Sequence, residues 1–197
     1  MTITINGNGT VTGISVGGLP DGIVDNDMLA ANVNTITVVD QWQITADVST
    51  GDSLLTSNWA RTDDTATGSY QVFGRIGTGM SQSSGVFTFP TTGIWRIDFT
   101  AAAYKADYPR RWLTARIQAT KDNSTYVDTS LNYSSSHADS GTSVYGYSTV
   151  STFFDVTSTS DCKVKFGVYS DGAMTWMSDS TNGTPYTNAF FTRLGDT

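Results

Sequence analysis

Residues 84–104 read SGVFTFPTTGIWRIDFTAAAY and carry the clearest structural signal in this chain. Two runs of alternating apolar and polar residues flank a Pro-Thr-Thr-Gly turn at 90–93. In the second run, Trp95, Ile97 and Phe99 share one face, because successive side chains of a strand point to opposite sides. The stretch therefore predicts two β-strands, each with one face turned toward a core.

Similar alternating runs occur on both sides of this stretch, separated by turn-forming Asp, Asn, Gly and Pro residues. The runs that predict strands are 36–45, 70–76, 85–89, 94–103, 111–119, 143–156, 162–169, 174–177 and 188–194. Within 162–168, Lys163 and Lys165 are expected to face solvent, while the polar segment 46–68 is expected to form loops. Roughly eight to ten short strands predict an all-β sandwich or jelly roll.

The composition supports an all-β chain and excludes several classes of function. All 18 acidic residues are Asp, and the abundant Thr favours strands. The net charge is −7 and the Lys and Arg residues are scattered, so we expect no nucleic-acid partner. No apolar run approaches the roughly 18 residues that cross a bilayer, and the N-terminus lacks the features of a secretory signal. Cys162 is the only cysteine, which rules out an intrachain disulfide.

The first 34 residues have a different character from the rest. Asn-Gly pairs at 6–9 between short apolar runs predict a hairpin. Because no aromatic residue precedes Trp42, this segment cannot build a core of its own. We therefore expect an anchoring segment and linker over 1–34, followed by a β head over 35–197. The aspartates at positions 21, 25 and 27 are interpreted as turn formers, since a calcium loop of the twelve-residue type ends in Glu.

Residues 84–104 resemble the start of the globular head of the C1q/TNF-like superfamily. The matching positions are Gly85, Phe87, Pro90, Gly93 and Phe99. Trp95 stands where Tyr is usual, and Ile97 where Phe is common. The closing stretch NAFFTRLGD, residues 188–196, is similar to the last strand of that family. The resemblance covers about residues 70–195 and implies a C1q-like jelly roll that assembles as a homotrimer.

Residues 9–35, GTVTGISVGGLPDGIVDNDMLAANVNT, resemble leader segments of fibre and appendage proteins of tailed phages, particularly marine and cyanobacterial phages. In those proteins a G-G-L-P-D-G-x-V-D-x-D-x-L-A pattern precedes a β-rich tip. The resemblance implies a virion protein, assembled in the host cytoplasm, whose N-terminus docks to tail, portal-proximal or capsid proteins. The expected anchor residues are Leu19, Pro20, Ile23, Val24, Met28 and Leu29.

Residues suited to catalysis or metal binding are sparse, and we expect no enzymatic activity, no cofactor and no metal site. His137 is the only histidine, and neighbours such as Ser134 and Asp139 in one loop rarely supply the geometry of a triad. Glycoside hydrolysis needs two carboxyl groups at a set separation. The candidate pairs lie in turn-like surroundings where Asp is structural, namely Asp63 with Asp64 and Asp171 with Asp179.

Aromatic and arginine residues gather beside a Pro turn in residues 104–117, and such residues are common anchors of binding sites. The expected receptor-binding residues are Tyr104, Tyr108, Arg110, Arg111 and Trp112, with the acidic groups of a host polysaccharide as the ligand. The alternative is that Trp112 packs on the sheet and the arginines cover an edge. The expected trimer contacts are Phe190, Phe191 and Trp176, and the two adjacent phenylalanines should face opposite sides of their strand.

The sequence thus predicts a non-enzymatic virion protein, a trimeric short fibre or a capsid or tail appendage that adheres to the host through its β head. A carbohydrate-binding module or adhesin unrelated to a virion remains the second hypothesis. A polysaccharide-degrading tail protein is the third, and the sparse catalytic residues count against it.

Overall fold

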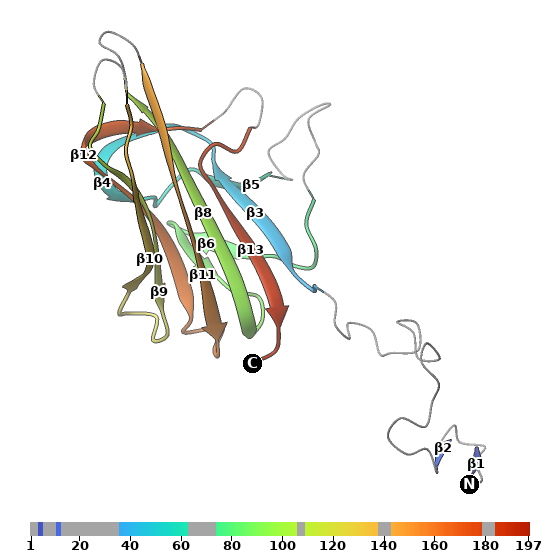
Figure 1. Ribbon diagram of the computed structural model, residues 1–197. Helices are drawn as coiled ribbons and strands as arrows, with labels where there is room; N and C mark the ends of the chain where they lie inside the picture. The colour runs from blue at the N-terminus through green and yellow to red at the C-terminus, as the bar shows by residue number, and fades with distance from the viewer. Residues whose placement is uncertain are drawn as a thin grey trace. The chain divides into compact units, whose positions relative to one another are not determined.

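The computed structural model describes residues 4–5, 11–12, 36–62, 74–105, 109–137, 143–178 and 184–197. The chain divides into two units, Met1–Thr35 and Ile36–Thr197 (Figure 1). In the first unit, β1 (Thr4–Ile5) pairs antiparallel with β2 (Val11–Thr12). This pairing confirms the hairpin that the Asn-Gly pairs predicted.

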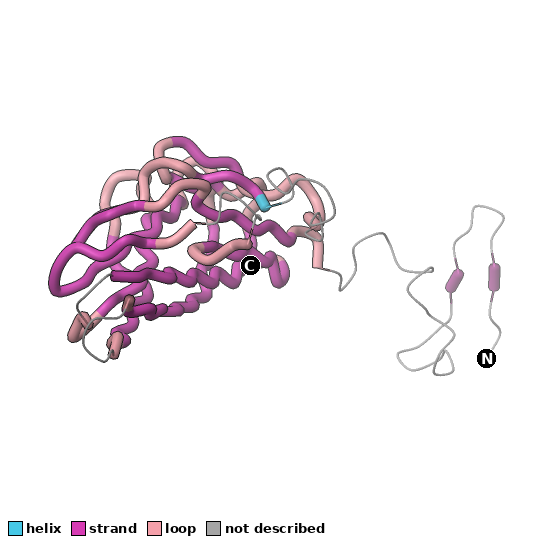
Figure 2. The backbone as a smooth tube through the Cα atoms, turned by 90° about the horizontal axis from the view of Figure 1, so that it is seen from above, coloured by secondary structure: helices cyan, strands magenta, loops and turns pink. Residues whose placement is uncertain are grey.

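The second unit is built almost entirely of strands and the loops that connect them (Figure 2). All of its strand pairs are antiparallel. The strands are β3 (Val39–Ile44), β4 (Val48–Leu54), β5 (Trp59–Arg61), β6 (Ser81–Ser83), β7 (Val86–Thr88), β8 (Gly93–Lys105), β9 (Leu113–Thr120), β10 (Val127–Ser134), β11 (Val144–Val156), β12 (Lys163–Trp176) and β13 (Asn188–Gly195).

The strands form two layers that share one core. The first layer has the order β11–β8–β13–β3–β5, and Figure 1 shows its members side by side. The second layer has the order β10–β9–β12, with β4 and β7 on the other edge of β12 and β6 beyond β7. The layers join at one end, where Thr175 and Trp176 of β12 pair with β8. The result is a nearly closed antiparallel sandwich.

Aromatic rings from both layers meet in the core. Phe99 of β8 lies 4.8 Å from Phe166 of β12, measured between ring centroids, and Phe191 of β13 lies 5.8 Å from the same ring. The alternation predicted for Trp95, Ile97 and Phe99 is confirmed, because all three are fully buried. Each buried side chain of this size contributes about 1.5–3 kcal/mol through the hydrophobic effect, so the two faces hold each other.

A buried carboxylate near the start of the second unit connects three of its segments. Asp40 on β3 is 1% exposed and accepts hydrogen bonds from the Trp42 indole N–H at 2.9 Å and the Met80 backbone N–H at 2.6 Å. The Arg61 guanidinium donates to it at 3.2 Å from β5 and lies 4.6 Å from the centroid of the Trp42 ring. One side chain thereby ties β3, β5 and the segment before β6 together.

Several elements differ from the sequence predictions. Strands β4 and β5 form within 46–62, where loops were expected, and β10 was not predicted. The sequence did not predict β4 and β10, because both lack a regular apolar alternation. Their positions are fixed by pairing with β12 and β9. Residues 163–176 form one strand instead of two, with residues 170–173 bulging out of the β4 pairing.

Lys163 was expected to face solvent and is 9% exposed, with its ammonium donating to the Thr159 carbonyl at 2.6 Å. It lies at the start of β12 between β7 and β9, and its charged end reaches a loop carbonyl. The predicted strand 70–76 lies mostly outside the described residues. Its last residue, Ile76, forms an isolated bridge with Val39.

Candidate binding faces

The outer surface of β11, β8 and β13, called here the first-layer face, carries a group of exposed aromatic side chains. On β11, Tyr145, Tyr147 and Phe153 are 65%, 69% and 70% exposed. On β13, Phe190 is 40% exposed and lies opposite Asp98 of β8 in the register. Because the core-facing residues alternate with these, the aromatic side chains cannot reach the interior of the same chain. An exposed apolar group of this kind typically marks a contact surface.

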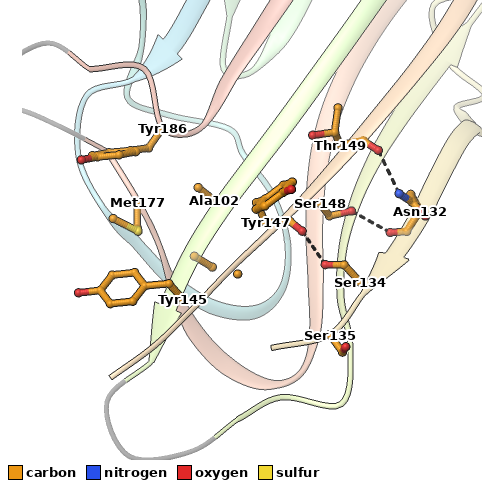
Figure 3. A pocket seen from close by; sticks show the side chains of 12 residues that line it. Ala102, Asn132, Ser134, Ser135, Tyr145, Tyr147, Ser148, Thr149, Met177 and Tyr186 are labelled. Atoms are coloured by element: carbon orange, nitrogen blue, oxygen red, sulfur yellow. Dashed lines mark hydrogen bonds between the residues drawn. The ribbon is translucent and has the colours of Figure 1, made fainter. Parts of the chain in front are cut away.

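One end of the first-layer face contains a hollow of about 700 Å³. Figure 3 shows Tyr145, Met177 and Tyr186 on one side of Tyr147, and the polar residues of β10 on the other. Its size and its mixture of aromatic, apolar and hydroxyl groups match a typical binding pocket.

The β10 side of the hollow is closed by side-chain hydrogen bonds that replace a strand ladder. The Ser134 hydroxyl donates to the Tyr147 carbonyl at 2.6 Å, and the Asn132 amide donates to the Thr149 carbonyl at 3.2 Å (Figure 3). The Ser148 hydroxyl donates to the Asn132 carbonyl at 3.0 Å. These bonds satisfy backbone groups of β10 and β11 that would otherwise invite another strand to pair there.

The residues predicted for a trimer contact differ in exposure. Phe190 is exposed on the first-layer face, whereas Phe191 is fully buried in the core, so the two face opposite sides as expected. Trp176 is also fully buried, and its indole N–H donates to the Thr50 carbonyl at 3.1 Å. Assigning Phe191 and Trp176 to a subunit contact was therefore wrong, because neither side chain has surface to offer a second chain. The signal that sequence analysis missed is the row of exposed aromatics on β11.

The predicted receptor-binding residues lie on two different faces. Tyr104 belongs to β8 and stacks on Tyr145 of the first-layer face, with ring centroids 5.9 Å apart. Arg111 and Trp112 lead into β9 and contact side chains of β12 in the second layer. The chain passes from one layer to the other between β8 and β9, so the structure does not bring these residues together. Tyr108 lies outside the described residues.

The arginines of this cluster are bound to the bulge of β12. The Arg110 guanidinium donates to the Ala173 carbonyl at 3.0 Å. The Arg111 side chain is 77% exposed, pairs with Asp171 at 3.3 Å and lies 4.4 Å from the centroid of the Trp112 ring. The alternative, in which Trp112 packs on the sheet and the arginines cover an edge, therefore holds in part for Trp112 and Arg110, while Arg111 keeps most of its surface exposed.

Further charged and aromatic groups lie on the same outer surface of β9 and β12, called here the second-layer face. Arg116 of β9 pairs with Asp52 of β4 at 2.9 Å. The Lys165 ammonium of β12 lies 3.6 Å from the centroid of the Tyr126 ring. Tyr169 of β12 is tilted against Trp112, with ring centroids 6.3 Å apart. Sequence analysis missed Lys165 and Tyr169 as site residues, because only the pairing of β9 with β12 brings them onto one face with Trp112.

The candidate catalytic groups do not assemble in the described residues. His137 is exposed, and the Ser134 hydroxyl is bonded to a backbone carbonyl instead of to a base. Asp171 is paired with Arg111, whereas its proposed partner Asp179, together with Asp63, Asp64 and Asp139, lies outside the described residues. Among the residues that the structure describes, no three His, Cys, Asp or Glu side chains are grouped to hold a metal ion.

Two other predictions concern the N-terminal anchor and membrane-spanning segments. The anchor residues Leu19, Pro20, Ile23, Val24, Met28 and Leu29 lie outside the described residues. None of the helical residues in the described ranges belongs to a helix long and apolar enough to cross a membrane.

Among the described acids, the most perturbed lies in the turn between β9 and β10. The pKa of the Asp122 carboxyl is held far below its usual value. The largest cause is the hydrogen bond from the Thr120 hydroxyl at 2.7 Å, followed by the backbone N–H groups of Thr125 at 2.7 Å and Ser124 at 2.9 Å. This carboxylate is a turn-closing group with a structural role.

Comparison with known proteins identifies the fold. No family model and no curated protein sequence matches the chain. The solved structure of Eiger TNF from S. frugiperda matches with 9% identity over 83% of this chain and 96% of that chain, at a TM-score of 0.53. Murine APRIL at pH 5.0 matches with 12% identity over 80% of this chain and 98% of that chain, at a TM-score of 0.49. The likeness to Eiger confirms the predicted all-β jelly roll of the TNF/C1q-like type.

Proposed function

We propose that this chain is a non-enzymatic, homotrimeric virion protein of a tailed phage, a short fibre or a capsid or tail appendage with an adhesive β head. The observation that carries the assembly is the exposed aromatic row of the first-layer face. Tyr147 and Phe153 of β11 and Phe190 of β13 lie on the two strands that flank β8 in a TNF/C1q-like sandwich, and they face away from their own core. Covering them with another copy buries apolar surface that the single chain leaves in water.

The distribution of exposed apolar residues suits a closed ring. A cyclic trimer uses a heterologous contact, in which two different patches of one chain meet each other on neighbouring subunits. The first-layer face supplies one patch. Strand β10 supplies the other, because Leu131 and Tyr133 are 41% and 61% exposed on its outer side. The two patches lie on either side of the edge where β10 meets β11, so one can fit over the other in the next subunit.

The virion role rests on the sequence of the first unit. Its GGLPDGIVDNDMLA run resembles phage leader segments, and the chain divides into two units after this segment. In this proposal, Leu19, Pro20 and Met28 belong to the segment that docks to another virion protein. Three heads on one assembly then present weak host contacts together, which raises avidity by about 10² to 10⁴.

Light scattering tests the assembly. The purified chain should have about three times the chain mass of 21.1 kDa. The double change Phe153→Ser and Phe190→Ser should give a folded monomer, because both side chains are exposed in the single chain. Ile76→Ser is the matched control, since Ile76 is 48% exposed on a segment beside β3 and should not alter the mass. A wild-type mass equal to one chain at all concentrations would refute the trimer.

Particle incorporation tests the virion role separately. A chain that lacks residues 1–35 should still trimerise through its head but should be missing from assembled particles. A full-length chain that is absent from purified particles would refute the virion role and leave the second hypothesis, an adhesin unrelated to a virion.

A further inference from the structure

The second-layer face gathers positive charge on an acidic chain. The chain has 11 Lys and Arg residues and a net charge of −7. Five of these cations belong to β9 and β12 or to the segment that leads into β9, and one of them, Lys163, is buried. The other four lie on the second-layer face. They are Arg110, Arg111, Arg116 and Lys165.

Packing holds two of these cations flat against the backbone. The Arg110 guanidinium lies over Gly172, where an added Cβ would come within 2.7 Å of a guanidinium nitrogen. Arg116 lies over Gly167 in the same way, and an added Cβ there would collide with its Nε. The absence of a side chain at both glycines makes room for the arginines. Because the side chains are already ordered, little conformational entropy is lost when they bind a ligand.

The other two cations lie against aromatic rings. Arg111 lies 4.4 Å from the Trp112 ring centroid, and Lys165 lies 3.6 Å from that of Tyr126. Tyr169 stands between these two pairs, next to Trp112 and four residues from Lys165 along β12. Trp112 and Gln118 are six positions apart, which corresponds to about 20 Å of extended strand. The face therefore alternates cations with aromatic rings over the length of several sugar rings.

The charges on this face are only partly neutralised. Asp171 pairs with Arg111, and Asp52 pairs with Arg116. Within the described ranges, Arg110 and Lys165 have no carboxylate at ion-pair distance, since Arg110 donates to a carbonyl and Lys165 lies on a ring. Lys165 can therefore bind an anionic group without leaving a carboxylate. Arg111, whose side chain is 77% exposed, contacts Asp171 through its Nε and turns its terminal nitrogens to a ligand. Guanidinium groups bind carboxylate and sulfate oxygens in a fixed fork geometry.

We propose that the second-layer face is the docking site for an acidic polysaccharide, with Arg111 and Lys165 binding its anionic groups and Trp112 and Tyr169 contacting its sugar rings. Aromatic side chains offer an apolar surface with a polar edge, which suits a ring that has both C–H and hydroxyl groups. This inference rests on the proposed adhesive function and assigns it to the outer surface of β9 and β12, beside the Leu131 and Tyr133 patch of β10 that the proposed trimer contact uses. It replaces Tyr104, which belongs to the first-layer face, with Tyr169 and Lys165.

Alginate, a polymer of carboxylated sugars, is the probe, and dextran is the neutral control. Binding of the full-length protein to each immobilised polymer is measured at about 0.1 M salt. The wild type should bind alginate and not dextran. The double change Arg111→Gln and Lys165→Gln should weaken alginate binding about tenfold or more. Lys121→Gln is the matched control, because Lys121 is a lysine with 53% exposure that pairs with Asp155 on β11 instead of lying on this face.

Light scattering of the same variants separates this inference from the assembly. A trimeric double variant with weakened binding supports the site. If the wild type does not bind alginate, or binds alginate and dextran equally, the inference is overturned while the proposed trimer still stands. Unchanged binding in the double variant also overturns it. A double variant that becomes monomeric shows that the second-layer face is a subunit contact, which overturns both this site and the proposed position of the trimer interface.

Discussion

Replacing Asp40 with Ala should destabilise the head strongly, because this buried carboxylate serves three donors. The change leaves the Trp42 indole N–H and the Met80 backbone N–H without an acceptor, and both residues are buried. It also removes the Asp40 partner of Arg61, whose side chain is 18% exposed and still donates to the Met80 carbonyl. Each buried donor left unpaired costs about 1–3 kcal/mol, and breaking a buried ion pair costs about 3–5 kcal/mol in total. We expect a loss of about 3–4 kcal/mol, since the exposure of Arg61 reduces the cost.

The assay is urea unfolding at one fixed chain concentration, because the stability of an oligomer depends on concentration. Asp155→Ala is the control, since Asp155 pairs with Lys121 and the two side chains are 43% and 53% exposed. An exposed pair of this kind contributes about 0–1 kcal/mol. Asp40→Asn keeps one acceptor oxygen and should fall between the two. If Asp40→Ala lost no more stability than Asp155→Ala, the hydrogen bonds of Asp40 would not be what holds β3, β5 and the segment before β6 together.

Three further predictions follow from the packing, the turn chemistry and the division of the chain. Phe166→Ala should cost about 3–5 kcal/mol in the same unfolding assay, because Phe166 contacts rings of both layers; a loss below about 1 kcal/mol would contradict a shared core. The pKa of Asp122 is lowered in the folded state, so its stabilising effect is present above the unfolded value near 4 and is lost as the pH falls further. Lowering the pH from 5 to 2 should therefore reduce the thermal unfolding midpoint of the wild type more than that of Asp122→Asn. Equal dependence of the two midpoints on pH would be evidence against this role. Deleting residues 1–35 should leave the unfolding midpoint of the head unchanged, since residues 36–197 form a unit with its own core, and an unfolded product would contradict that division.

The sequence was most informative where one strand face is buried and the other is not. Strand β8 was predicted because its aromatic residues recur at every second position, and β11 and β13 showed related patterns. Strand β10 gave no such signal, since most of its residues are exposed on both faces. Strand β4 is polar and is fixed by its pairing with β12. Such strands depend on long-range partners that a local pattern cannot contain.

The candidate sites also depend on long-range partners that the local sequence does not show. The segment from Tyr104 to Trp112 looks continuous in sequence, yet the chain crosses from the first layer to the second within it. Tyr104 therefore joins Tyr145, whereas Trp112 joins Tyr169. Composition and spacing identified residue types that suit a binding surface. Only the register of β9 with β12 shows that Lys165 and Tyr169 complete the second-layer face.

The salt dependence of alginate binding should distinguish local attraction from the charge of the whole molecule. Each chain has a net charge of −7, so a trimer repels an acidic polymer over most of its surface. At about 0.01 M salt the screening length is roughly 30 Å and distant aspartates oppose binding, whereas at about 0.1 M it is roughly 10 Å and mainly the cations of the second-layer face act.

At about 1 M salt the screening length falls to roughly 3 Å, and the attraction of the cations should be lost as well. We therefore expect alginate affinity to be highest near 0.1 M salt and lower at both extremes, measured with the full-length trimer. The Arg111→Gln and Lys165→Gln double variant should show no such maximum, because it keeps the repulsion without the two local cations. An affinity that only falls as salt rises would mean that the aspartates elsewhere on the trimer do not oppose the polymer. In that case the net charge does not restrict contact to this face.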